Sequence, residues 1–152
     1  MTSAFFSAID GAKKIRRQIR RAQSRMRDDL PKAIFKALNL IRSDAIKSVQ
    51  YGTKTGRLYK VGRKTLHRAS APGQAPASNT GNLARSVVVQ IDTDGRGGDV
   101  VARAEYAAAL EFGTSKIAPR PFMYPAARFN RDKIVKLIRD AINNSWKRAA
   151  GI

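Results

Sequence analysis

Apolar residues recur every three or four positions in three segments of the chain, the spacing of a helix with one apolar face. The positions are Phe5, Ala8, Ala12, Ile15, Ile19, Ala22 and Met26 in the first segment, Ile34, Leu38, Ile41, Ala45 and Val49 in the second, and Phe129, Ile134, Leu137, Ile138, Ala141, Ile142 and Trp146 in the third. Most of the stability of such helices comes from packing of the apolar face. We therefore expect the second and third helices to face the core, with Trp146 as a packing residue.

The sequence Asp28-Asp29-Leu30-Pro31 separates the first two helical segments. Aspartate is a common helix cap, and proline is tolerated in the first turn of a helix. We therefore expect one helix to end here and a second to begin, running to Tyr51. The chain then divides into a basic amphipathic N-terminal helix, residues 1–29, and a single domain, residues 30–152.

The chain is strongly basic, with 30 lysine and arginine residues against 11 acidic residues and a net charge of +19. Such an excess favours contact with nucleic acid, an anionic membrane or an acidic protein surface. The first helix carries Lys13, Lys14, Arg16, Arg17, Arg20, Arg21, Arg25 and Arg27, with only Asp10 nearby. Like charges along a helix repel each other, which favours a polyanionic or acidic partner over a simply solvated face. A membrane surface fits less well, because the apolar face is mainly alanine and isoleucine.

A second basic segment, residues 51–82, is rich in glycine and proline and contains no acidic residue. This composition predicts a long loop. Such a loop is usually functional or disordered, and it can become ordered only against a partner. Its cations include Lys54, Arg57, Lys60, Arg63, Lys64 and Arg68.

Two β-branched runs, residues 86–92 and 99–104, flank the turn-forming sequence TDGRGG and predict a β-hairpin. An isolated hairpin is barely stable, so its apolar face needs the second helix, a further strand or a neighbouring subunit.

No residue pattern indicates catalysis, a metal site or a cofactor. The chain has no cysteine, and His67 is its only histidine. Asp92, Asp94 and Asp99 surround a turn, where aspartate commonly bonds to nearby backbone. The sequence GRGG lacks the following Gly-Lys-Ser/Thr of a phosphate-binding loop. We expect a protein that is not an enzyme.

The N-terminus places apolar residues before its cations, the reverse of a secretory signal. No apolar run approaches the length of about 20 residues needed to span a membrane. We expect a soluble protein that is made and kept inside a cell, at least at first.

Two blocks of residues between positions 71 and 126 form a recognisable pattern. The first is APGQAPA at residues 71–77 followed by Thr80-Gly81, Leu83 and Ser86, and the second is YAAALEFGTSK at residues 106–116 followed by Pro121-Phe122 and Pro125-Ala126. In order and spacing they resemble the tail-completion or head–tail joining proteins of long-tailed phages, related to minor tail protein Z of lambda-like phages. The resemblance covers about residues 30–145.

The resemblance implies an α+β fold, in which an antiparallel β-sheet packs against a long α-helix and a C-terminal α-helix. The basic N-terminal helix would be an addition to it. It further implies a structural virion protein that forms a ring, usually hexameric, at the head–tail junction around the path of the DNA. Its partners would be further copies of itself, adjacent neck or connector proteins and the tail tube, with no membrane. The protein would be part of the virion and would lie in the host cytoplasm during assembly. The alternative is an independent, sequence-nonspecific nucleic-acid-binding protein of the histone-like kind.

The resemblance also implies sites. Subunit or partner contacts are expected at Tyr106, Glu111, Phe112, Gly113, Thr114, Pro121, Phe122, Thr80, Gly81, Leu83 and Ser86. Glu111 is expected to pair with an arginine of the same or the next subunit, and Phe112 and Phe122 could instead pack in the core. Contacts with DNA or an acidic partner are expected at Lys13, Lys14, Arg16, Arg17, Arg20, Arg21, Arg25, Lys54, Arg57, Lys60, Arg63, Lys64 and Arg68.

Overall fold

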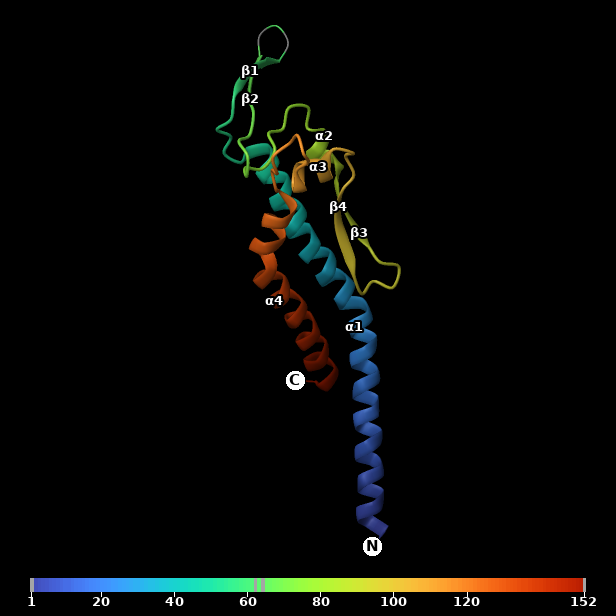
Figure 1. Cartoon of the computed structure of the whole chain (residues 1–152). Coiled ribbons are helices and arrows are strands. Elements are labelled where there is room, and N and C mark those ends of the chain that lie inside the picture. The colour runs from blue at the N-terminus through green and yellow to red at the C-terminus, as the bar shows by residue number, and fades with distance from the viewer. Residues whose placement is uncertain (1, 62, 64, 152) are drawn as a thin grey trace.

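The structure, a computed structural model, describes residues 2–61, 63 and 65–151, without the side chains of residues 2–8. Its helices are α1 (Thr2–Tyr51), α2 (Asn82–Ser86), α3 (Ala107–Phe112) and α4 (Met123–Ala150), and its strands are β1 (Leu58–Val61), β2 (Thr65–Arg68), β3 (Val87–Ile91) and β4 (Gly98–Ala102). Helices α1 and α4 lie side by side, and the β3–β4 hairpin lies along α1 (Figure 1). This arrangement confirms the α+β class, with two small antiparallel sheets.

The predicted helix break at residues 28–31 is wrong, because α1 continues through Pro31. Proline inside a helix removes one backbone hydrogen bond and crowds the preceding turn, at a cost of about 3 kcal/mol or more. Packing on both sides of Pro31 offsets that cost: Ala22 is fully buried before it, and Ala37 is 2% exposed after it. The helix changes direction part-way along its length (Figure 1), as proline-containing helices commonly do.

Helices α1 and α4 pack through small and polar residues. Asn130 and Ser145 of α4 are both buried. The Asn130 amide donates to the Asp44 carboxylate at 2.7 Å, and the Ser145 hydroxyl donates to the Asp29 carboxylate at 3.2 Å. Arg148 also pairs with Asp29 at 3.1 Å. Asp29 was predicted to cap a helix, but in the structure it joins the two long helices instead.

The predicted β-hairpin is confirmed as β3–β4. Of the three possible supports, the second predicted helix, a further strand or a neighbouring subunit, it packs on the helix, which is part of α1. Its register pairs Val87 with Ala102 and Ile91 with Gly98. Val87 is fully buried, and its carbonyl accepts a 2.9 Å hydrogen bond from Arg42 of α1. The hairpin is therefore held to the helix by both apolar packing and a polar bond.

The core is small, and alanine supplies half of its fully buried cluster. The cluster contains Ala45, Val49, Leu83, Ala84, Val87, Ala107, Phe122 and Ala126. Phe122 is the large side chain at its centre, with 1% of its surface exposed. Trp146 was predicted to pack in the core but is 46% exposed, because small residues of α4 occupy the contact with α1. Much apolar surface thus remains exposed to solvent.

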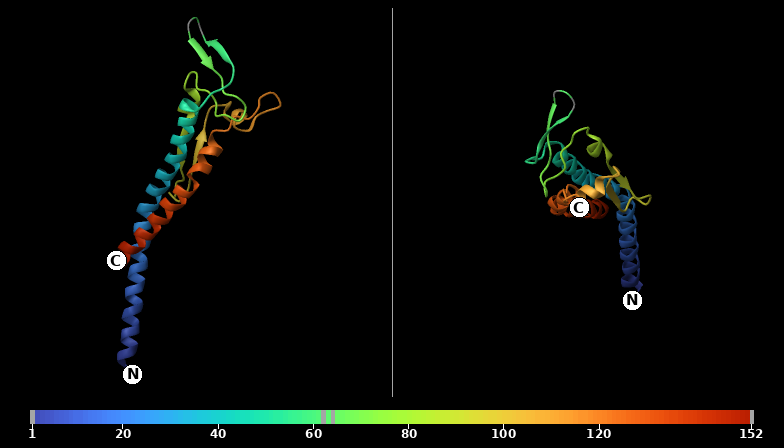
Figure 2. Two further views of the ribbon diagram at one scale, coloured as in Figure 1. Left: turned by 90° about the vertical axis from the view of Figure 1, so that its left-hand side faces the viewer. Right: turned by 45° about the horizontal axis from the view of Figure 1, so that its top comes forward.

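Two parts of the chain extend beyond this core. The N-terminal part of α1 continues past the end of α4, and the β1–β2 hairpin forms an arm at the opposite end (Figures 1 and 2). Residues 51–82 were predicted to form a loop, so this strand pair was not expected from the sequence.

Candidate assembly interface

The stretch between α3 and α4 is organised by one buried carboxylate. Glu111, at the end of α3, accepts hydrogen bonds from the backbone N–H groups of Phe122 at 2.8 Å, Met123 at 3.0 Å and Tyr124 at 2.9 Å. These amides begin α4 and have no partner within the helix. A carboxylate there is favoured by both hydrogen bonding and the helix dipole. Glu111 therefore caps α4, and among the described residues it makes no ion pair with an arginine. Its pairing with an arginine of the next subunit stays a prediction.

Gly113 turns the chain directly after Glu111 and Phe112. Its φ of 76° and ψ of 176° define a conformation that is almost restricted to glycine. A Cβ atom at this position would lie 2.8 Å from the Ile117 carbonyl oxygen and 3.0 Å from Pro119. Thr114 then closes the loop, since its N–H donates to the Ile117 carbonyl and its hydroxyl accepts from the Ile117 N–H at 3.1 Å.

The segments that contain the two sequence blocks meet in space. The Gly73 N–H donates to the Pro119 carbonyl at 2.9 Å, and the Arg120 guanidinium donates to both the carbonyl and the hydroxyl of Ser70. Ser70 is 4% exposed. The α3–α4 loop is thus braced against the segment that follows the β1–β2 arm. Sequence reasoning missed Ser70 and Arg120, because no local pattern connects residues 50 positions apart.

The α3–α4 corner, residues 106–124, contains several exposed apolar side chains. Phe112 is 80% exposed, Tyr124 64%, Tyr106 48% and Ile117 41%. Pro121 is half-buried beside them. Phe122, by contrast, is in the core, so it supports the corner from inside and is not available to a partner in this fold. Of the two phenylalanines considered for the interface, Phe112 is the exposed one.

The residues expected from the first block have mainly local roles. Thr80 and Gly81 lead into α2, with Gly81 at a φ of 75°. Leu83 is 5% exposed and packs in the core. The Ser86 hydroxyl donates to the Leu83 carbonyl at 2.7 Å, which closes the short helix. Thr80 is the exposed member of this set.

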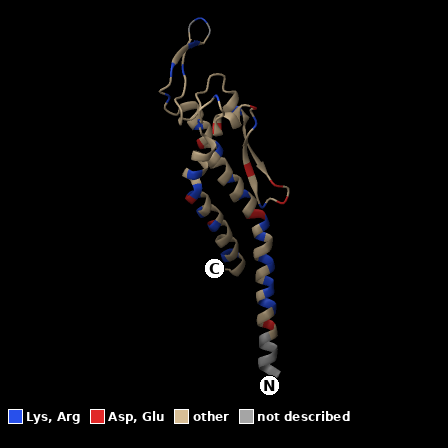
Figure 3. Cartoon of the chain, in the orientation of Figure 1, with Lys and Arg blue, Asp and Glu red and all other residues tan. Residues whose placement is uncertain are grey.

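The cations predicted on the first helix lie on the exposed surface of α1 (Figure 3). The set is Lys13, Lys14, Arg16, Arg17, Arg20, Arg21, Arg25 and Arg27. Within the described part of the chain, one ion pair involves this set, between Lys13 and Asp10 at 3.7 Å, and both side chains are largely exposed. Screening by salt makes such a pair weak. The segment therefore presents nearly its full positive charge to solvent.

The arm carries the second basic set. Arg57, Lys60, Arg63 and Arg68 are exposed, and Lys64 lies outside the described residues. The register pairs Leu58 with Arg68 and Lys60 with Leu66, so these two leucines and two cations share one face of the hairpin. Leu66 is 64% exposed.

Lys54 differs from the other predicted cations. Its ammonium donates to the carbonyls of Ser48 at 2.8 Å and Ala75 at 2.7 Å, joining the end of α1 to the sequence block after the arm. Burial lowers the pKa of Lys54. This lysine has a structural role and is not well placed to contact a polyanion.

The other polar residues considered for chemistry have local partners. The Asp94 carboxylate accepts from the Arg96 N–H at 2.9 Å, a turn bond of the predicted kind. The ring of His67 packs edge-on against Tyr59, with 5.3 Å between centroids. In the part of the chain that the structure describes, no group of three or more histidine or acidic side chains could hold a metal ion. No helix there is long and apolar enough to cross a bilayer.

Comparison with known families decides the class of protein. A family profile described as "Bacteriophage HK97-gp10, putative tail-component" matches residues 13–113, which is 101 of the 152 residues. The chain belongs to this HK97-gp10-like family. It is a tail-associated structural protein of a bacteriophage, as the resemblance in its sequence indicated. No curated protein and no solved structure matches the chain at the significance required.

The family match extends further toward the N-terminus than the resemblance did. The resemblance was limited to residues from about 30 onward, whereas the match begins at residue 13 and includes the basic part of α1. The match ends at Gly113, so it includes the first sequence block, residues 106–113 of the second block and Glu111 itself. The remaining residues of the second block and α4 lie beyond it.

Proposed function

We propose that this tail protein forms a ring, hexameric like the tail tube it meets, at the junction between tail and head. The single observation that carries this proposal is the match to a family of tail components over residues 13–113. In this position the protein completes the tail and binds the adjacent neck or connector proteins. It acts by binding alone, without catalysis or a cofactor.

The α3–α4 corner supports the proposal, because it presents apolar side chains on a rigid frame. The Glu111 cap and the contact between Arg120 and Ser70 hold the loop from both sides. A rigid loop loses little conformational entropy on binding. Exposed Phe112 and Tyr124 are therefore the residues proposed to contact a neighbouring subunit or tail protein.

The charge supports a position around the DNA path. Phosphate contacts of lysine and arginine require no base sequence and release counterions. The exposed cations of the arm, including Arg57, Lys60 and Arg63, are proposed to face the lumen of the ring.

Electron microscopy of virions made without this protein, beside intact virions, tests the position of the protein. Filled heads separated from finished or overlong tails support the proposal. Normally joined particles exclude the head–tail position. Duplex binding by the purified protein with steep salt dependence, together with normal joined particles, would favour the histone-like alternative.

A variant pair tests the corner itself. Phe112→Asp should leave the melting temperature within about 2 °C of wild type, because the side chain is 80% exposed. It should reduce the yield of infectious particles at least about tenfold, because the contact with a partner would then bury a carboxylate. Phe35→Asp is the matched control, since Phe35 is 54% exposed on α1, away from the corner. Equal particle yields from the two variants would contradict the role of the corner.

A further inference from the structure

The apolar stripe of α1 is covered by α4 along part of its length only. Ala22 is fully buried, but Ile19 and Ile15, three and seven positions earlier on the same stripe, are 40% and 58% exposed. Helix α4 ends at Ala150, so the stripe continues past the end of its partner. The uncovered segment, residues 12–19, is about 12 Å long at 1.5 Å per residue. An established helix–helix interface thus continues into solvent.

The same chain contains an open apolar groove. It lies between α1, α4 and the β3–β4 turn, and its walls include Leu30, Leu38, Ile134, Ile138 and Ile142. Its volume is about 350 Å³. A neighbouring hollow of about 520 Å³ shares Leu30 and Arg96 with it, so the two form one groove along α1.

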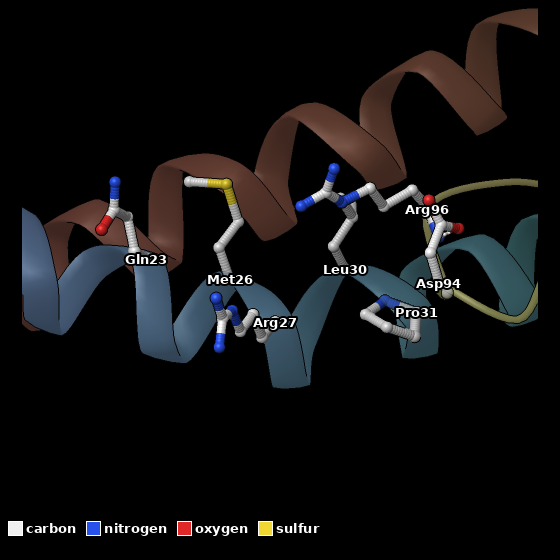
Figure 4. Close-up of a pocket in the computed structure, with 8 residues that line it drawn as sticks. Gln23, Met26, Arg27, Leu30, Pro31, Asp94 and Arg96 are labelled. Carbon is white, nitrogen blue, oxygen red and sulfur yellow. Dashed lines mark hydrogen bonds between the residues drawn. The ribbon is translucent and has the colours of Figure 1, made fainter.

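Figure 4 shows the end of this groove nearer the N-terminus. Met26 and Leu30 rise from α1, while Asp94 and Arg96 enter from the β3–β4 turn. Asp94 also lines a shallow hollow with Asp92 and Asp99. Residues 92–99 contain these three aspartates and Arg96 as their only cation, so the turn is net negative. An acidic turn therefore borders an apolar groove.

The uncovered stripe matches the groove in chemistry. The stripe is apolar at Ile15 and Ile19, and each isoleucine is followed directly by an arginine, Arg16 and Arg20. Isoleucines can fill the groove while arginines lie near the acidic turn, a combination that gives both affinity and register. In one chain the two surfaces cannot meet, because the stripe and one wall of the groove belong to the same helix, α1.

We propose that residues 12–19 of α1 from one copy lie in the α1–α4 groove of a neighbouring copy. This contact joins two different surfaces, and such heterologous contacts produce closed rings when the rotation between copies closes. The inference rests on the ring proposed above and specifies how its subunits are linked. It also assigns the basic segment to protein contact and leaves the arm for DNA.

Engineered disulfides test the contact cleanly, because the natural chain has no cysteine. The full-length Ile19→Cys/Ile138→Cys variant should form a ladder of disulfide-linked multimers under oxidation that collapses to monomer on reduction. Arg17→Cys/Ile138→Cys is the matched control. Arg17 lies two residues away on the other side of the helix, so it should form no ladder.

Three results would overturn the inference. The Ile19→Cys/Ile138→Cys protein could crosslink no more than the Arg17 control, or the wild-type chain could be monomeric at every concentration tested. Alternatively, Ile19→Cys alone could crosslink to a dimer, which would assign the stripe to symmetric pairing of two α1 helices.

A charge placed on the stripe provides an independent measurement. Ile19→Asp should weaken self-association by about tenfold or more, because a carboxylate would enter an apolar groove. Its melting temperature as a dilute monomer should be unchanged, since the residue is outside the core. Unchanged self-association would contradict the contact.

The proposed function and this inference fail in different ways. If the disulfide ladder forms in solution but a phage lacking the protein makes normal particles, the head–tail position is refuted and the contact between copies is supported. Rings in wild-type tails, without crosslinking of Ile19→Cys/Ile138→Cys, refute the contact and leave the position standing.

Discussion

Replacement of Glu111 by alanine tests whether one buried carboxylate holds the α3–α4 corner. The side chain is 9% exposed and accepts three backbone hydrogen bonds at 2.8 to 3.0 Å. Loss of a helix cap typically costs about 0.5–2 kcal/mol, and hydrogen bonds to a charged group contribute about 1.5–3 kcal/mol each. The full cost is smaller than the sum of these terms. Met123 is half-buried and Tyr124 is exposed, so water can replace part of the lost hydrogen bonding. We expect a loss of about 2–4 kcal/mol in the free energy of unfolding.

A loss of this size lowers the melting temperature by about 4–16 °C in a chain of this length. The melting temperature is measured by circular dichroism at several protein concentrations, so that subunit association can be separated from folding. Hydrogen exchange gives a local readout: the amides of Phe122, Met123 and Tyr124 should lose protection before those in the middle of α4. Glu111→Gln keeps one acceptor oxygen and should cost roughly half as much.

Glu105→Ala is the matched control for this prediction. Glu105 is exposed, and its carboxylate makes no ion pair or hydrogen bond with the described residues. Its replacement should change stability by less than about 0.5 kcal/mol. If Glu111→Ala is as stable as Glu105→Ala, Glu111 is not the residue that anchors the start of α4.

Three further mutational experiments have defined outcomes. Gly113→Ala should lose about 1–3 kcal/mol by denaturant unfolding, because alanine resists the φ of 76°; an unchanged midpoint would show that the loop can rearrange. A double-mutant cycle of Asp44→Ala and Asn130→Ala should give a coupling energy of about 0.5–3 kcal/mol, since the two side chains bond at 2.7 Å between the long helices; zero coupling would contradict this contact. Pro31→Ala should raise the melting temperature by several degrees, because it restores an amide donor in α1 for about 1–3 kcal/mol; a lower melting temperature would show that the fold needs the bend.

The sequence by itself determined the long helical segments, the β3–β4 hairpin and the class of protein. Apolar periodicity located the helical segments, and the β-branched runs located β3 and β4 to within two residues. These signals are local, because each depends on residues a few positions apart. The two sequence blocks were sufficient to indicate a phage tail protein, which the family match confirmed.

Tertiary structure decided what those local signals could not. Asp28-Asp29-Leu30-Pro31 is a plausible helix boundary when read alone, but packing of α4 on both sides of Pro31 keeps α1 continuous. Glu111 could be assigned a partner only when the fold brought the start of α4 to it. Phe112 and Phe122 are equivalent in the sequence, and the direction of the chain through Gly113 and the prolines exposes one and buries the other. Contacts between distant residues are therefore what convert a recognisable sequence block into a surface that a partner can bind.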